Sequence, residues 1–221
     1  MMNSAEWDSD SDDYLPLHIA VRTNNPTRVE SLLLSGIDSS RKDIRGLTPL
    51  HQSTLDGATI CLCVLLQNGA DVSIPDAYGN TAIILATERL DSFEVYGRYW
   101  NVRAVRTIEK LLKYGADIEE RSMNGMTPLH IAAMHGHTGA VQLLIDKGAC
   151  LYALDPVGKM PEELATDAGL PVLAALIKRE RGCQTHLAFA MGQHERLGNN
   201  SAVRMISEEE MGIILGMLSD N

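Results

Sequence analysis

The chain of 221 residues is poor in aromatic side chains, with two Phe, two Trp and six Tyr. A core with few large rings has to be built from Leu, Ile, Val, Ala and Met, which favours closely packed helices. No apolar run approaches the ~20 residues of a membrane-spanning helix, and the opening MMNSAEWDSDSDD lacks the apolar stretch of a secretory signal. We therefore expect no membrane association and a cytoplasmic or nuclear location, or both.

Cysteine and positive charge are scarce as well. The four cysteines, Cys61, Cys63, Cys150 and Cys183, show no spacing typical of a disulfide framework, so free thiols in a reducing compartment are expected. The 19 Lys and Arg residues against 29 Asp and Glu residues leave a net charge of −10. This balance argues against a nucleic-acid-binding surface.

Motifs of common catalytic sites are missing. The chain has no phosphate-binding G-x-x-x-x-G-K-[ST] loop and no G-x-S-x-G nucleophile elbow. Three histidines, His130, His135 and His137, stand close together, but the H-E-x-x-H spacing of a zinc protease is not there. In isolation the cluster leaves a metal site, a catalytic base and a structural role open.

What the sequence does contain is a repeat. Segments similar to TPLHIAA recur with separations of 33, 33, 46 and 33 residues, counted at Pro16, Pro49, Ala82, Pro128 and Pro161. A second signature, similar to LLxxGAD, follows the same spacing, including its one irregular interval. Two signatures with a shared period indicate stacked structural repeats.

The pattern resembles the ankyrin repeat, whose marks are a 33-residue period, TPLH opening a first helix and LLxxGAD closing a second. The resemblance covers about Leu15–Arg181. It implies an all-α solenoid of about five helix-turn-helix units joined by β-turn fingers. Thr48 and Thr127 are expected to cap first helices, and Gly69 and its equivalents to end second helices.

The resemblance also bears on the histidines. His130 is the third copy of a position held by His18 and His51, and in the family this histidine makes structural hydrogen bonds at the helix start. His137 matches the Gly-His turn between two helices and is expected to be structural, whereas His135 falls at a variable position facing the groove. No metal or other cofactor is expected, and no enzymatic activity.

Three segments are expected along the chain. Residues 1–13 carry five acids and no base, which predicts a disordered acidic tail. Residues 14–181 form the ankyrin repeat domain, and residues 182–221 a C-terminal helical extension with helices near 185–193 and 207–218. The extension either covers the exposed apolar end of the stack or docks a ubiquitin-ligase adaptor.

The irregular interval places a 13-residue insertion in the third repeat, near residues 90–102. Four aromatic residues lie there: Phe93, Tyr96, Tyr99 and Trp100. Two interpretations are open. The insertion lengthens the two helices of the repeat and packs its rings on the stack, or it projects as an aromatic contact site.

The family resemblance implies a non-enzymatic module, monomeric by itself, that binds another protein through the concave surface of turns and first helices. The alternative is an adaptor, in which the repeats select a client and the C-terminal helices recruit a ubiquitin-ligase or signalling complex. Leu47 and Met126 have the further alternative of packing between neighbouring turns. The expected contact residues are Ile44, Arg45, Leu47, Leu55, Tyr78, Asn80, Tyr96, Tyr99, Trp100, Met123, Asn124, Met126, Met134, His135 and Val157.

Overall fold

The computed structural model describes the backbone of residues 15–88 and 97–190, and the side chains of residues 15–88 and 104–182. Within these residues the chain forms ten helices and no strand. The helices are α1 (Pro16–Arg22), α2 (Pro26–Leu34), α3 (Pro49–Asp56), α4 (Thr59–Gln67), α5 (Ala82–Glu88), α6 (Gly97–Lys113), α7 (Pro128–Met134), α8 (Thr138–Asp146), α9 (Pro161–Asp167) and α10 (Pro171–Ala190). The acidic tail at 1–13, Phe93, Tyr96 and the expected helix at 207–218 lie outside the described residues.

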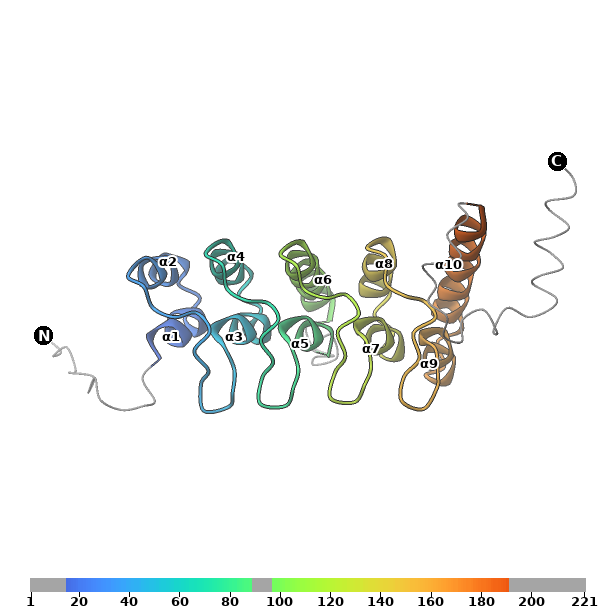
Figure 1. The fold of residues 1–221 in the computed structure, drawn as a ribbon, viewed down its shortest axis with the longest axis horizontal. Helices are drawn as coiled ribbons and strands as arrows, with labels where there is room; N and C mark the ends of the chain where they lie inside the picture. The colour runs from blue at the N-terminus through green and yellow to red at the C-terminus, as the bar shows by residue number, and fades with distance from the viewer. Residues whose placement is uncertain (1–14, 89–96, 191–221) are drawn as a thin grey trace, which may run out of the picture.

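The helices stack in two rows (Figure 1). The first helices α1, α3, α5, α7 and α9 lie side by side, each in contact with the next, and the second helices α2, α4, α6 and α8 do the same. The long loops between repeats project away from both rows as four fingers (Figure 1). The expected all-α repeat solenoid is confirmed.

Small residues let the first helices approach one another. Ala20, Ala86, Ala132 and Ala165 occupy equivalent places and are 0 to 2% exposed, and Ser53 takes this place in the second repeat. Both rows supply large core side chains: Leu50, Ile83, Ile84, Leu129 and Ile131 come from first helices, and Leu62, Leu65, Ile108, Leu111 and Leu144 from second helices. The core is therefore continuous along the stack and almost entirely aliphatic.

The first helices begin as the sequence predicts. Thr127 precedes Pro128, and its hydroxyl accepts the backbone N–H of His130, while Nδ1 of His130 accepts the backbone N–H of Thr127 at 3.3 Å. Thr48 and His51 repeat this arrangement. Each pair satisfies two donors that a helix start leaves without an intrahelical partner.

The histidines also join neighbouring repeats. Because Nδ1 of His130 is an acceptor, Nε2 carries the proton and donates to the carbonyl of Lys159, 3.2 Å away in the next repeat. His18 donates in the same way to the carbonyl of Leu47 at 2.8 Å. Burial lowers the pKa of His18, His51 and His130, which keeps the three imidazoles neutral. The structural role expected for His130 is confirmed.

The third repeat lacks this arrangement. Ile84 stands where the other repeats have His51 or His130, and the hydroxyl of Thr81, 3% exposed, has no hydrogen-bond partner among the described residues. A buried polar atom without a partner costs free energy. The helix start of α5 is therefore weaker than those of α3 and α7.

The second helix of the third repeat is longer than its counterparts. Helix α6 has 17 residues, against nine in α2, α4 and α8, while α5 has seven, as many as α1 and α7. Tyr99 and Trp100 lie on the added turns of α6, and their side chains are outside the described part of the chain. The lengthening expected of the second helix is found in α6, whereas residues 89–96, which follow α5, lie outside the described residues.

At the other end, α10 continues through Gly182 to Ala190 as one helix of 20 residues. The separate short helix expected near 185–193 is thus the end of α10, up to Ala190, rather than a new element. Glycine at position 182 does not interrupt the helix because its φ is not positive.

Candidate protein-binding surface

Each finger is a tight turn organised by one polar side chain at its base. Oδ1 of Asp43 accepts the backbone N–H groups of Arg45 and Leu47, both at 2.9 Å. Asp76 and Asp155 make the equivalent pairs of bonds in the second and fourth fingers. Burial raises the pKa of Asp43, but the hydrogen bonds from Leu47 and Arg45 outweigh it, so the net pKa lies below its usual value. The first, second and fourth turns are thus held by a carboxylate, and in the third finger the hydroxyl of Ser122 accepts the N–H of Met126 at 3.3 Å.

One large apolar side chain is exposed at the tip of every finger. Ile44 is 87% exposed, Tyr78 65%, Met123 69% and Val157 79%. A single exposed apolar residue needs no explanation, but here one is exposed in each of the four fingers, so together they form a row. Arg45 and Asn124 are exposed beside two of them.

The fingers contact one another. A Cβ added to Gly46 would lie 2.6 Å from that of Ala77, and one added to Gly125 would lie 2.5 Å from Pro156, so these tips touch. The side-chain oxygen of Asn80 accepts the backbone N–H of Met123 at 3.3 Å. The finger row is therefore a connected surface.

Arg121 makes a second bridge between fingers. Its Nη1 donates to the carbonyls of Gly125, at 2.6 Å, and Leu154, at 3.0 Å. The bridging roles of Asn80 and Arg121 were not predicted, because they join residues 43 and 33 positions apart.

Several predicted contact residues lie deeper. Leu47 is 6% exposed and belongs to the core, and Met126 is half-buried against it. Burial of Leu47, and of part of Met126, favours the packing alternative for these two residues. Leu55 and Met134 are half-buried near the ends of first helices.

His135 is exposed at the end of α7, and its ring stacks on that of His137 with centroids 6.0 Å apart. His135 also affects the pKa of Glu88, which lies at the end of α5. Burial raises the pKa of Glu88, Asp76 raises it further, and His135 opposes both. The two residues stand at the ends of adjacent first helices.

A hollow of about 580 Å³ lies between the first finger and helices α1 and α3. Its lining includes Ile19, Arg22, Lys42, Ile44 and Asp56. Arg22 occupies the place on α1 that Leu55, Glu88 and Met134 occupy on later helices. Alignment of the first repeat with the others identifies Arg22 as a further candidate contact that the motifs of the later repeats do not predict.

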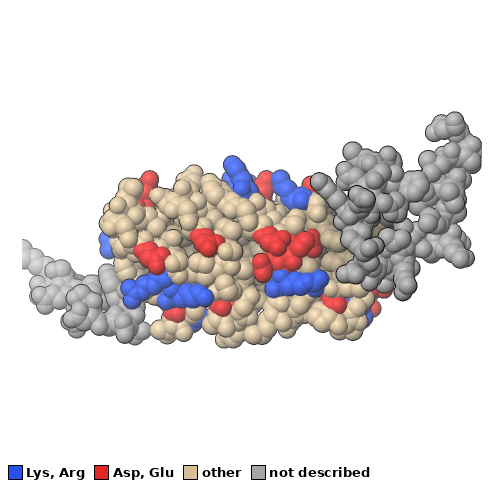
Figure 2. All heavy atoms as spheres, viewed as in Figure 1, with Lys and Arg blue, Asp and Glu red and all other residues tan. Residues whose placement is uncertain are grey.

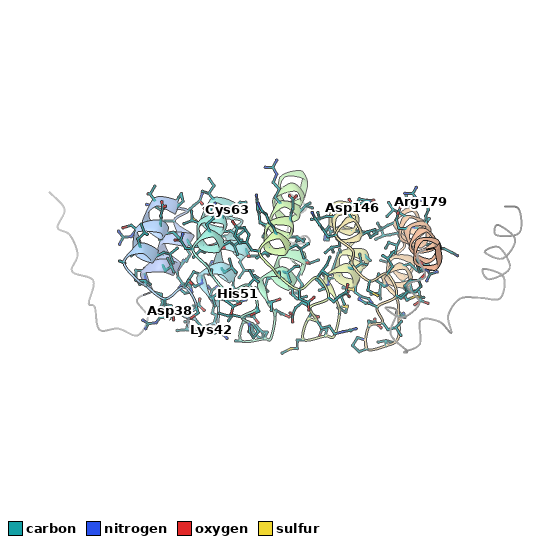
Figure 3. The ribbon with its side chains drawn as sticks, turned by 45° about the horizontal axis from the view of Figure 1, so that its top comes forward. Asp38, Lys42, His51, Cys63, Asp146 and Arg179 are labelled. Carbon is teal, nitrogen blue, oxygen red and sulfur yellow. The ribbon has the colours of Figure 1, made fainter. Side chains whose placement is uncertain are left out.

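Charge on the stack is arranged in rows. Figure 2 shows acidic side chains along the middle of one face, with basic side chains beside them toward the fingers. Asp38, Asp71 and Asp117 stand at equivalent loop positions, where each accepts a backbone N–H from two residues further along the chain. Lys42 lies on the first finger, near the N-terminal end of the stack (Figure 3).

Among the described residues, no cluster of three or more His, Cys, Asp or Glu side chains is arranged to hold a metal ion. In the same part of the chain, no helix is both long and apolar enough to cross a bilayer. Cys61, Cys63 and Cys150 are free thiols, buried, half-buried and exposed respectively.

Comparison with known proteins places this arrangement in a family. The family model described as ankyrin repeats (3 copies) matches residues 5–96 and 100–188. The chain is 31% identical over 171 residues to SH3 and multiple ankyrin repeat domains protein 2 of Homo sapiens, covering 77% of this chain and 8% of that protein. It is 31% identical over 141 residues to human NF-kappa-B inhibitor alpha, covering 64% of this chain and 32% of the inhibitor.

A third relative, tyrosine-protein kinase HTK16 of Hydra vulgaris, is 28% identical over 200 residues, covering 88% of this chain and 25% of the kinase. The chain thus spans a third or less of the length of these relatives. Two matched segments, the 33-residue period and the stacked helix pairs agree, and the chain belongs to the ankyrin repeat family.

Proposed function

We propose that this chain is a non-enzymatic module that binds another protein through the finger tips and the adjoining first helices. Ankyrin repeats in general mediate protein–protein interaction. The observation that carries the proposal for this chain is the row of exposed apolar tips formed by Ile44, Tyr78, Met123 and Val157. Apolar and aromatic side chains on a rigid support are typical anchors of protein interfaces.

The half-buried and polar residues beside the row extend the proposed surface. Arg45, Asn124 and His135 are exposed, and Leu55 and Met134 present part of their side chains. Met126 is half-buried like Leu55 and Met134 and stays a proposed contact, whereas the buried Leu47 supports the surface from below. Tyr96, Tyr99 and Trp100 remain proposed contacts of the insertion.

The proposed partner is a protein rather than a nucleic acid, since the net charge of −10 opposes binding to phosphate backbones. We propose a monomer that acts in the cytoplasm, the nucleus or both, where its free thiols stay reduced. Two relatives are named as enzymes, a tyrosine-protein kinase and a putative palmitoyltransferase. This chain covers 25% and 31% of those proteins.

The test removes two tips from the row. Tyr78→Ala with Met123→Ala is compared with Leu34→Ala with Val172→Ala, which truncates apolar side chains on second helices that are at least as exposed. Proximity labelling in cells identifies the proteins that lie near the native chain. The tip variant should no longer label a defined group of them, and the control variant should label all of them. A tip variant that melts normally and keeps every neighbour contradicts the proposed surface.

An adaptor role is a second proposal, supported by α10. This helix has 20 residues, where α2, α4 and α8 have nine, so it continues beyond the repeat that it completes. Truncation after Ala190 keeps every described helix. The adaptor role predicts a protein with an unchanged melting temperature that loses one defined group of partners. A lowered melting temperature with partners retained identifies residues 191–221 as a cover for the stack.

A further inference from the structure

The hollow at the first finger contains two cations that form no ion pair within the described residues. These are Arg22 at the end of α1 and Lys42 on the finger, and both are exposed. The third cation of the lining, Arg45, is engaged: Nε and Nη2 donate to Oδ2 of Asp43 at 3.0 and 2.9 Å. Arg22 and Lys42 are therefore available to an anionic ligand.

The two acids of the lining are already hydrogen-bonded. Asp43 accepts from the side chain of Arg45 and from two backbone N–H groups. Asp56 accepts from Nε2 of Gln52 at 2.6 Å, and Gln52 in turn accepts from Arg45. Both carboxylates therefore have partners of their own, whereas Arg22 and Lys42 line the hollow without an ion pair among the described residues.

Apolar side chains complete the hollow. Ile44 is 87% exposed and Ile19 is 41% exposed, and Leu15 lies at the edge where the described chain begins. A ligand that fits this lining combines carboxylates with at least one large apolar group. A short peptide segment has that chemistry.

We propose that the hollow is a docking site for an acidic peptide segment and that its resident occupant is residues 6–13 of the same chain. This segment contains Glu6, Asp8, Asp10, Asp12 and Asp13, no base, and one large apolar side chain, Trp7. The carboxylates match Arg22 and Lys42, and the indole matches the apolar wall of Ile19 and Ile44.

Chain connectivity favours this occupant over a segment of another protein. Leu15 lines the hollow, so the acidic segment is attached at its rim. An extended chain spans about 3.3 to 3.6 Å per residue, which lets Trp7 reach any part of a hollow this size from Leu15. A short tether gives an effective concentration on the order of millimolar, so even weak contacts are populated.

Docking of the segment covers the N-terminal part of the proposed partner surface, because Ile44 and Arg45 belong to both. The segment and a partner would then compete for the first finger and leave the other three tips accessible. The inference goes beyond the proposed function and holds whether or not the finger row binds a partner.

The first experiment follows Trp7 in the full chain. Trp100→Phe removes the other tryptophan, so that all indole fluorescence comes from Trp7. Acrylamide should quench Trp7 less than it quenches a free peptide of residues 1–14, and Arg22→Glu with Lys42→Glu should abolish the difference. Lys113→Glu with Lys147→Glu, which changes the charge equally at another hollow, is the matched control and should preserve it.

Two results of this experiment overturn the proposal. One is a Trp7 that is quenched as readily in the chain as in the free peptide. The other is an equal loss of protection in both charge-reversal variants, because that identifies a long-range charge effect rather than contact in the hollow.

The second experiment titrates fluorescein-labelled peptide 1–14 into two full-length chains, the native one and one with Asp8, Asp10, Asp12 and Asp13 changed to Asn. If the native segment fills the hollow about nine-tenths of the time, the neutralised chain should bind the peptide about ten-fold more tightly. Equal affinity assigns the hollow to another protein's acidic segment and overturns the resident occupant. Absence of binding to both chains overturns the docking site. Neither titration involves a partner, so failure of the proposed partner surface leaves both unchanged.

Discussion

Threonine to valine at three equivalent positions should change stability in opposite directions. Thr48, Thr81 and Thr127 precede the first helices of their repeats and are 1, 3 and 1% exposed. The hydroxyls of Thr48 and Thr127 accept the N–H of a histidine and lie 2.8 Å from its Nδ1. The hydroxyl of Thr81 has no partner among the described residues. Valine keeps the branched shape and removes only the hydroxyl chemistry.

The magnitudes follow from what each hydroxyl does. Loss of a helix cap costs about 0.5 to 2 kcal/mol, so Thr48→Val and Thr127→Val should each be destabilised by about 1 kcal/mol or more. Removing a buried polar atom that lacks a partner recovers its desolvation penalty, about 1 kcal/mol or more for a hydroxyl. Thr81→Val should therefore be more stable than the native protein.

Thermal and urea unfolding measure the difference. For a domain of this size, 1 kcal/mol corresponds to about 2 to 4 °C in melting temperature, so the three variants should separate clearly on either side of the native protein. The double variant Thr48→Val with Thr81→Val should lie near the native value if the two sites act independently. A drop for Thr81→Val as large as that for Thr48→Val would refute the reasoning, because it requires a partner for the Thr81 hydroxyl.

Three further predictions concern packing, the fingers and pH. Leu144→Ala, at a side chain that is 0% exposed, should cost about 2–5 kcal/mol in urea unfolding; a near-zero change would place Leu144 outside the core. Gly125→Ala should destabilise more than Gly158→Ala, since both have positive φ but only the first would press a Cβ on a neighbouring finger; equal melting temperatures would show that the fingers do not touch there. Burial lowers the pKa of the three helix-start histidines, so they stay neutral in the fold and take up protons on unfolding; stability should be complete above about pH 6.5 and fall as pH drops toward their native pKa values. Burial raises the pKa of Glu88 and Glu119, which has the opposite effect on the pH dependence of stability. The urea midpoints at pH 7.5 and 5.5 are therefore compared in a variant with both residues changed to Gln. Equal midpoints in that variant would contradict neutral buried histidines.

Local signals in the sequence predicted the repeat architecture well. The helix signals are local: a proline follows Thr48 or Thr127, a histidine stands three residues after the threonine, and a glycine follows each second helix. Each signal affects only the backbone within a few residues of it. They therefore predict helix starts and ends without knowledge of the neighbours. The spacing of the two signatures then determined the stack and located the insertion in the third repeat.

Exposure at the surface was harder to predict, because it depends on contacts between fingers. Leu47 and Met123 both lie on turns, yet one is 6% and the other 69% exposed. Leu47 is held against the preceding repeat: its carbonyl accepts a hydrogen bond from His18, and its side chain joins the core. The division of the insertion between α5 and α6 likewise depends on how far α6 continues as a helix, which the period alone does not specify.

The bond from Met123 to Asn80 changes how mutational data on this surface should be interpreted. Asn80, on the second finger, accepts a hydrogen bond from the backbone of Met123 on the third finger. Replacing Asn80 therefore shifts Met123, even where Asn80 itself does not contact the ligand. An alanine scan will therefore score Asn80 as important even for a ligand that never touches it. Comparing Asn80→Asp, which keeps the accepting oxygen, with Asn80→Ala separates support of the finger from recognition.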